Sequence, residues 1–371
     1  MSRSISEVKR LVIKIGSLLL VDPESGRLRT GWLSALAEDV ARCRARGQDL
    51  ILVSSGAIAL GRGLIGLAGG QLRLEDSQAA AAAGQIRLAH AYQEALARHE
   101  VSVAQILLTI GDTEERRRYL NARSTINRLL QHGAVPVINE NDTVATNEIR
   151  FGDNDRLAAR VAQMVDAECL VLLSDIDGLY TADPGSNPDA TLIPEVSTIT
   201  AEIEAYAAEW RPGYSSGGMI TKLRAAKVAL GAGCHMVIAD GKAHHPLSAI
   251  ENGARCTWFV ASSSPRTARK QWIAATLTPA GTLTIDPGAA RALTAGKSLL
   301  PAGVKAVAGA FDRGDAVAVH DGQGREIARG LSAYSAEDAQ RIMGHKSGEI
   351  EALLGYRGRD EMIHRDDLVL L

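Results

Sequence analysis

Along the first 260 residues, short apolar runs alternate with longer segments whose apolar side chains recur at helical spacing. The runs are rich in Val, Ile and Leu and predict buried strands, at 9–15, 49–53, 101–108, 134–138, 168–173, 235–239 and 255–260. The longer segments predict helices, at 32–46, 57–61, 76–98, 114–131, 155–165 and 219–230. Strands that alternate with helices in this way indicate an α/β fold with a mostly parallel sheet covered on both faces, a three-layer αβα sandwich.

The pattern changes after residue 260. Residues 261–277 open with Ser and Pro, carry several basic side chains and are typical of a linker. Beyond residue 278, short strands are separated by Gly and Asp turns, at 282–285, 304–310, 316–320 and 326–331. The sequence therefore predicts a first domain over 1–260, a linker over 261–277 and a small β-rich domain over 278–371.

Charge and composition narrow the class of protein. The chain is 46 % hydrophobic and has a formal net charge of -2, so nothing in its overall charge attracts nucleic acid or an anionic membrane. The predicted second domain holds 11 Lys and Arg against 13 Asp and Glu, which argues against an RNA-binding face. The first residues lack the apolar core of a signal peptide, no apolar run is long enough to span a membrane, and the four cysteines are widely spaced. We therefore expect a cytoplasmic protein with buried thiols.

Polar side chains gather where the run at 134–138 ends. Asn139, Glu140, Asn141 and Asp142 follow it directly, and a second cluster, 153–155, lies behind a segment that could form a β-hairpin. Ligands of an open α/β sheet bind beyond the carboxyl ends of its strands, which is where both clusters would lie. Asn and Asp also gather wherever turns need them, so either cluster alone could be structural. Together they favour a polar ligand pocket.

A glycine motif at 61–66, GRGLIG, matches the dinucleotide-binding fingerprint letter for letter. In that fingerprint the glycines form the turn from strand to helix. Here the turn falls at 54–56, several residues earlier. We therefore reject a nicotinamide site and interpret the motif as a flexible glycine-rich loop.

Two lysines and a glycine-rich helix start point to phosphate. Glycines at 217–218 precede the predicted helix at 219–230, where backbone N–H groups and the helix dipole favour an anion, and Lys222 lies in its first turn. Lys14 lies near the end of the first strand. With acids able to hold Mg²⁺, this set suits phosphoryl transfer, which depends on positioning and charge neutralisation. No histidine accompanies these residues, which favours a carboxylate acceptor because a carboxylate needs no general base. The alternative is an ordinary surface lysine after a glycine linker.

These motifs, in this order, resemble those of the amino acid kinase superfamily, and most closely those of its bacterial glutamate 5-kinase family. The matching segments are VIKIGS (12–17), VSSGAIALG (53–61), VPVINENDTVAT (135–146), FGDNDRLAARVA (151–162), LLSDIDGLYTADP (172–184) and SSGGMITKLRAAKVA (215–229). Residues 297–311 and 344–356 resemble the PUA domain that such kinases often carry. The resemblance implies an amino acid kinase domain over 1–260 and a PUA-like domain over 278–371.

The resemblance also implies a reaction and assigns its residues. MgATP would phosphorylate the side-chain carboxylate of L-glutamate, giving L-glutamyl 5-phosphate and ADP, the first step of proline biosynthesis. Lys14 and Lys222 would stabilise the transferring phosphoryl group, and Asp155 would hold both lysines. Glutamate would contact Ser55, Gly56, Asn139, Asp142 and Asn154. ATP would contact Lys14, Ser174, Asp175, Ser216, Gly217, Gly218, Met219, Ile220, Thr221 and Lys222. No residues are assigned to Mg²⁺, and Ile220 replaces a small polar residue of the family.

The family further implies inhibition by proline at or near the glutamate site and assembly into a homo-oligomer. Three alternatives stay open at this point. The chain could be another superfamily kinase, acting on acetylglutamate, carbamate or aspartate, although the NEND cluster and the second domain argue against this. It could bind or modify RNA through its PUA-like domain, against the charge of that domain. It could be a regulatory pseudokinase, against the presence of both lysines and Asp155.

Overall fold

A computed structural model describes residues 4–67, 70, 72–145, 154–208, 218–276 and 278–371 of the protein. The chain divides into two compact units, Met1–Pro265 and Arg266–Leu371. Within the described residues, no helix has both the length and the apolar character needed to cross a membrane. The hairpin expected at 143–151 and the possible cap Asp153 fall wholly or partly outside the described residues.

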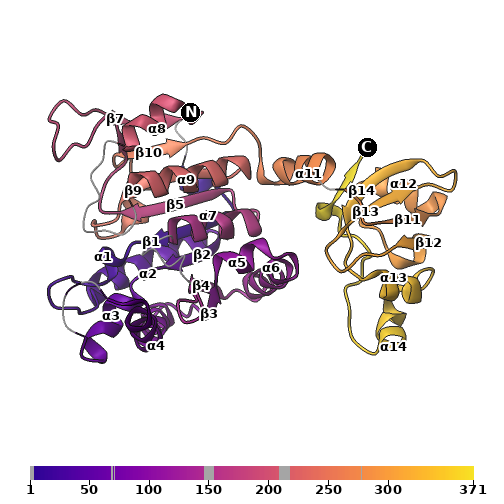
Figure 1. The fold of residues 1–371 in the computed structure, drawn as a ribbon, viewed down its shortest axis with the longest axis horizontal. Coiled ribbons are helices and arrows are strands. Elements are labelled where there is room, and N and C mark those ends of the chain that lie inside the picture. Colours follow the sequence, from indigo (N-terminus) through magenta and orange to yellow (C-terminus); the bar gives the residue numbers. More distant parts are fainter. Residues whose placement is uncertain (1–3, 68–69, 71, 146–153, 209–217, 277) are drawn as a thin grey trace. The chain divides into compact units, whose positions relative to one another are not determined.

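The first unit is built on an eight-stranded sheet (Figure 1). In spatial order the strands are β3 (Val103–Leu108), β4 (Val135–Glu140), β2 (Asp49–Ser54), β1 (Arg10–Ile15), β5 (Cys169–Ser174), β9 (His235–Asp240), β10 (Cys256–Phe259) and β8 (Glu195–Val196). The first strand in sequence lies in the middle of the sheet, parallel to β2 on one side and β5 on the other. The pairing of β10 with β9 is antiparallel. The prediction of a mostly parallel sheet is confirmed.

Helices cover both faces of this sheet, and successive side chains of a strand point to opposite faces. On β1, Leu11, Ile13 and Ile15 pack into one apolar core, whereas Val12 packs into the other. The first core is closed by α1 (Ser17–Leu20), α2 (Thr30–Ala45), α3 (Ala57–Leu64), α4 (Leu74–Ala97) and α10 (Pro246–Glu251). The second is closed by α5 (Ile110–Glu114), α6 (Arg116–Gln131), α7 (Asn154–Met164), α8 (Ala201–Ala208) and α9 (Met219–Gly231). Because side chains of a strand point alternately to its two faces, Lys14 shares the face of Val12 and points toward the helices of the second core.

Two glycines let α3 and α4 cross in backbone contact. A Cβ added at Gly61 would lie 1.7 Å from the carbonyl oxygen of Ala80, and one added at Gly84 would lie 1.8 Å from that of Ala57. Gly63, also in α3, has open space around it. The first glycine of the GRGLIG motif therefore serves helix packing, and the structure has α3 rather than a loop over most of that motif.

The second unit is built on a five-stranded sheet in the order β12 (Val304–Gly309), β11 (Gly281–Ile285), β13 (Ala316–His320), β14 (Glu326–Leu331) and β15 (Leu368–Leu370). After β11, its α-helices are α12 (Pro287–Thr294), α13 (Ala336–Ile342) and α14 (Ile350–Leu354). Where the sequence suggested a linker, the structure has the helix α11 (Pro265–Thr276), and Ile273 of this helix is fully buried against Ala316 and Leu331. The helix forms there because an apolar side chain within the basic segment finds a core to bury in.

Smaller elements complete the chain. The two-stranded sheet of β6 (Leu179–Tyr180) and β7 (Leu192–Ile193) follows β5. Single turns of 3-10 helix lie at Ile5–Glu7, Pro301–Gly303, Ser347–Glu349 and Arg365–Asp367. The helix predicted over 114–131 is α6, which begins at Arg116 because the side chain of Glu115 caps its start. The short helix α5, capped by Thr109, precedes it and was not predicted.

Candidate active site

A buried carboxylate joins two lysines at the carboxyl end of the central strands. Asp155, in the first turn of α7, is fully buried. Its Oδ1 lies 2.7 Å from Lys14 Nζ on β1, and its Oδ2 lies 3.2 Å from Lys222 Nζ on α9. Both lysines are themselves buried, at 7 % and 5 % exposure. The structure thus brings together the three residues predicted to be catalytic, from three separate elements.

The electrostatics of this cluster leave it ready for an anion. Burial by itself raises the pKa of Asp155, but the charges and hydrogen bonds of Lys14 and Lys222 outweigh burial and bring the pKa down to about 2. One buried carboxylate holds both ammonium groups in a site shielded from water. Charges in such a site interact with an incoming anion more strongly than they would at the surface.

A second cluster, made of side-chain amides, lies next to the lysine cluster. It is centred on Asn154, the residue before Asp155 in α7. Asn154 Nδ2 donates to three acceptors, the carbonyl oxygen of Ser54 at 3.1 Å, Ser55 Oγ at 2.8 Å and Asn139 Oδ1 at 3.2 Å. Asn154 Oδ1 is buried and has no hydrogen-bond partner among the described residues. Burying an acceptor without a hydrogen-bond partner lowers the stability of the fold. A ligand that donates a hydrogen bond to this atom would remove that cost.

The turn after β2 requires a glycine at its centre. Gly56 has a φ of 102° in the left-handed region, where a side chain would be strained, and it serves as the N-cap of α3. A Cβ there would also approach Val21 Cγ2 to 3.3 Å. This turn sets the Oγ of Ser55 against Asn154, so three of the residues predicted to bind glutamate are in direct contact or adjacent.

Asp142 lies two residues beyond the end of β4. Burial raises the pKa of its carboxyl group to about 6, and no hydrogen bond to it is seen from the described residues. A carboxylate held partly out of water without a counter-charge favours a cationic ligand, which would lower the pKa again.

The residues predicted to bind the nucleotide lie at the ends of β5 and α9. Ser174 Oγ donates to Asp175 Oδ1 at 3.0 Å, at the carboxyl end of β5. Gly218 is the N-cap of α9, and Thr221 Oγ1 lies 3.2 Å from Asp155 Oδ2, which links the start of this helix to the lysine cluster. Met219 is buried, whereas Ile220 is 44 % exposed. Ser216 and Gly217 lie outside the described residues.

Several polar residues of the site escaped the sequence analysis. Asn139 Nδ2 donates to Gln85 Oε1 at 2.7 Å, and the hydroxyl of Tyr92 lies 3.0 Å from Ser54 Oγ. Both side chains come from α4. A third, Gln78 Nε2, donates to the carbonyl oxygen of Ala145 at 3.0 Å. Residues 78, 85 and 92 are spaced by seven, which places them on one face of a helix, and this spacing is the signal that could have found them.

Lys242 was missed for a different reason. It follows β9, and its Nζ donates to the carbonyl oxygen of Asp175 at 2.7 Å. The preceding Gly241 donates its N–H to the Ser174 carbonyl at 2.8 Å and is packed so closely that a Cβ would lie 2.3 Å from Leu19 Cδ1. A contact between the ends of two neighbouring strands depends on sheet order, which the sequence does not reveal.

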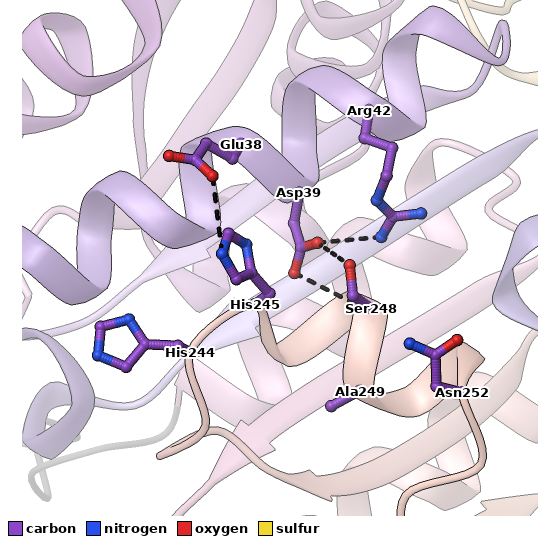
Figure 2. Close-up of a pocket in the computed structure, with 8 residues that line it drawn as sticks. All are labelled: Glu38, Asp39, Arg42, His244, His245, Ser248, Ala249 and Asn252. Carbon is purple, nitrogen blue, oxygen red and sulfur yellow. Dashed lines mark hydrogen bonds and ion pairs between the residues drawn. The ribbon is translucent and has the colours of Figure 1, made fainter.

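A pocket of about 530 Å³ lies elsewhere, between α2 and α10. Figure 2 shows Asp39 of α2 directed at the start of α10, where it accepts from the backbone N–H groups of Leu247 at 2.8 Å and Ser248 at 3.2 Å. Arg42 pairs with Asp39 at 3.0 Å, and His245 Nε2 lies 3.6 Å from Glu38. The carboxylate of Asp39 already binds Arg42 and the start of α10. We therefore interpret this pocket as part of the packing contact between α2 and α10 and not as a ligand site.

Metal-binding capacity is limited in the part of the chain that the structure describes. It contains no group of three or more His, Cys, Asp or Glu side chains arranged to hold a metal ion. Mg²⁺ that accompanies a nucleotide usually needs only one or two carboxylates, because phosphate oxygens and water supply the remaining ligands.

Comparison with known proteins covers both units. The model of the amino acid kinase family matches residues 9–240, and that of the PUA domain matches residues 281–354. Glutamate 5-kinase from Paramagnetospirillum magneticum is 64 % identical over 366 residues, which is 99 % of each chain. Glutamate 5-kinase from Rhodopseudomonas palustris is 61 % identical over 369 residues, all of this chain and 98 % of the relative. The protein of the same name from Rhizobium etli is 61 % identical over 368 residues, 99 % and 94 % of the two chains.

Proposed function

The chain belongs to the amino acid kinase family and, within it, to the glutamate 5-kinases, and we propose that its Lys14–Asp155–Lys222 cluster carries the chemical step. The reaction is the ATP-dependent phosphorylation of the side-chain carboxylate of L-glutamate, which gives L-glutamyl 5-phosphate and ADP, the first step of proline biosynthesis. The observation that supports this assignment of roles is the buried Asp155, which holds both lysine Nζ atoms.

In the chemical step, a carboxylate oxygen of glutamate attacks the terminal phosphorus of ATP. A new O–P bond forms to glutamate while the bond between that phosphorus and the ADP oxygen breaks. No proton needs to be removed from the nucleophile, because a carboxylate with a pKa near ~4 is already ionised. A site without a histidine base is therefore sufficient, and its main task is to stabilise the negative charge of the transferring group.

The two lysines supply that stabilisation and Asp155 supplies their geometry. Holding both ammonium groups on one carboxylate fixes them before the substrate arrives, so little reorganisation is needed in the transition state. The third donor to Asp155, Thr221 Oγ1, ties the start of α9 to the same point. The nucleotide phosphates would then lie at the N-terminus of α9, and Ser174 and Asp175, at the carboxyl end of β5, would contact the same nucleotide. Mg²⁺ bound to ATP would neutralise further phosphate charge.

Recognition of glutamate would fall to the amide cluster and Asp142. The unpartnered Asn154 Oδ1 and the partly buried Asp142 carboxylate are both acceptors, which suits the α-ammonium group of an amino acid. Ser55, Gly56 and Asn139 border the same space. An N-acetylated substrate has no ammonium group to offer these acceptors, so we expect it to bind poorly.

Proline inhibition is proposed on similar grounds. Proline carries a cationic amine next to a carboxylate and can occupy the part of the glutamate site that recognises these groups. If so, Asp142→Asn weakens glutamate binding and proline inhibition together. Inhibition that survives this substitution unchanged would place the proline site elsewhere.

We also propose a compartment and an assembly state. The four cysteines are free, which suits the reducing cytoplasm. Ile86 on α4 is 74 % exposed, and Leu64 and Ile65 at the end of α3 are 46 % and 43 % exposed. Such apolar exposure suits a homo-oligomer interface on this side of the first unit, and light scattering after size-exclusion chromatography would decide the oligomeric state.

The decisive experiment traps the product. The purified protein is incubated with MgATP, L-glutamate and hydroxylamine, which converts an acyl phosphate into a hydroxamate that can be measured. We expect hydroxamate with L-glutamate but not with N-acetylglutamate or aspartate. Lys222→Met should abolish it, whereas Lys227→Met, which removes an exposed lysine of the same helix, should not. Turnover of another carboxylate in place of glutamate would overturn the substrate, and unchanged activity of Lys222→Met would overturn its role.

A further inference from the structure

The glutamate site contains a chain of side-chain amides whose direction is fixed at both ends. The backbone N–H of Glu140 donates to Asn139 at 2.9 Å, and the atom it meets must be Oδ1 because an N–H can only donate. The carbonyl oxygen of Ser54 can only accept, so the atom of Asn154 that lies 3.1 Å from it must be Nδ2. These two backbone groups define which way both amides point.

The direction of the chain leads to an acceptor facing the ligand. With Asn154 Nδ2 committed to Ser54, Ser55 and Asn139, its Oδ1 is the remaining atom, and it is buried without a partner among the described residues. Asn154 as a whole is 8 % exposed. Flipping its amide would turn an oxygen toward the Ser54 carbonyl and toward Asn139 Oδ1, so the flipped state is disfavoured by two repulsive contacts.

Gln85 closes the other end of this chain. Its Oε1 accepts a hydrogen bond from Asn139 Nδ2 at 2.7 Å. This bond satisfies the amide nitrogen of Asn139, whose oxygen already accepts from the backbone N–H of Glu140. Without this acceptor, Asn139 could rotate and release Asn154. Gln85 reaches the site because its neighbour Gly84 lets α4 approach the backbone of Ala57, next to Gly56. The hydrogen bond of Tyr92 to Ser54, two turns further along α4, holds the same face of the helix in place.

We propose that Gln85 is a positioning residue that holds the Asn139 amide in the orientation set by the backbone, and through Asn139 supports Asn154, so that the glutamate site presents an acceptor and selects substrates with a free ammonium group. The inference rests on the proposed function, because it concerns the site where glutamate binds. It adds a specificity-determining residue on a helix that contributes none of the residues predicted from the sequence. Gln85 itself does not need to touch the substrate.

Two substitutions of matched length separate this role from general packing. Gln85→Met keeps the length of the side chain and removes the acceptor, whereas Gln85→Glu keeps an acceptor facing Asn139. The ligands are L-glutamate and glutarate, which has the same carboxylates without the ammonium group. For each variant we would measure kcat, the KM values for glutamate and ATP, the inhibition constant of glutarate, and the thermal midpoint.

We expect Gln85→Met to raise the KM for glutamate about tenfold, the equivalent of about 1.4 kcal/mol. In Gln85→Met, the KM for ATP and the inhibition constant of glutarate should stay within about twofold of their values in the unsubstituted protein. In Gln85→Glu, the KM for glutamate should also stay near the value of the unsubstituted protein. A KM for glutamate that stays within twofold in Gln85→Met would overturn the inference. So would an equal loss of glutamate and glutarate binding, or a failure of Gln85→Glu to restore it. Absence of glutamyl hydroxamate with the unsubstituted protein would instead overturn the proposed function.

Discussion

Replacing Asp155 by Asn tests the centre of the site, because it removes the one negative charge shared by two buried lysines. A carboxyl pKa of about 2, against an ordinary value of 3.8, corresponds to roughly 2 kcal/mol of stability at neutral pH, since each tenfold change in ionisation is worth about 1.4 kcal/mol. Because folding lowers this pKa, the contribution is present above about pH 4 and is lost as pH falls toward 2.

The substitution should cost more than this value. It leaves Lys14 and Lys222 buried with no carboxylate between them, and breaking a buried ion pair by removing one partner typically costs about 3–5 kcal/mol. We therefore expect the free energy of unfolding of the first unit to fall by about 3–5 kcal/mol. Hydroxamate formation should fall by at least two orders of magnitude, because the ammonium groups lose the carboxylate that positions them.

Hydrogen exchange of peptides from β1, α7 and α9, measured across a urea series, reports on this unit separately from the second one. The matched control is Glu204→Gln, which breaks an exposed pair with Lys227 and should change stability by less than about 1 kcal/mol. Adding Lys14→Met to Asp155→Asn should recover part of the lost stability, because one uncompensated charge is removed. If Asp155→Asn were as stable as the unsubstituted protein, or if the double variant were less stable than the single one, the electrostatic reasoning would be refuted.

Three further predictions concern other parts of the first unit. Since the pKa of Asp142 is raised to about 6 in the free protein, kcat/KM for glutamate should fall as pH drops below about 6, and Asp142→Asn should lower kcat/KM and abolish this pH dependence. A profile that keeps its acid limb in the variant would contradict the assignment. Gly61→Ala should destabilise the protein by about 3 kcal/mol or more in urea unfolding, whereas Gly63→Ala should be neutral or slightly stabilising; equal effects would show that the helix crossing can relax. Asp39→Ala should lower the free energy of unfolding by about 1–3 kcal/mol, because it leaves the start of α10 uncapped. The control, Glu38→Ala, removes an exposed side chain and should change the same free energy by less than about 0.5 kcal/mol.

Most strands of the first unit could be predicted, because runs of Val, Ile and Leu of this length are typical of buried strands. The run at 134–138, for example, became β4 with a shift of one or two residues. The order of the strands could not be predicted, since pairing β1 between β2 and β5 depends on packing across the whole chain. The strand predicted at 255–260 became β10, but its antiparallel direction and the helix α11 were not predicted, because contacts with distant residues decided both.

The site was predictable where its residues follow strands and less so where they lie within helices. Lys14, Asn139 and Ser174 could be found because a polar residue at the end of an apolar strand is conspicuous. Gln85 and Tyr92 were missed because their spacing of seven is a weak signal in an Ala-rich helix, where many polar residues face water. The GRGLIG motif shows the opposite error of pattern matching, in which glycines needed for a helix crossing imitate a nucleotide-binding turn.

The ion pairs of Asp155 also bear on how the protein matures on the ribosome. Lys14 and Lys222 lie about 210 positions apart in the sequence, and α7 with Asp155 is synthesised between them. At about 5–20 residues per second, roughly 10–40 s separate the synthesis of the two lysines. Asp155 precedes Lys222 by 67 residues, so for about 3–13 s of that interval a nascent chain can pair Asp155 with Lys14 alone. The cluster that we propose for phosphoryl transfer is therefore complete only once Lys222 and α9 have been made.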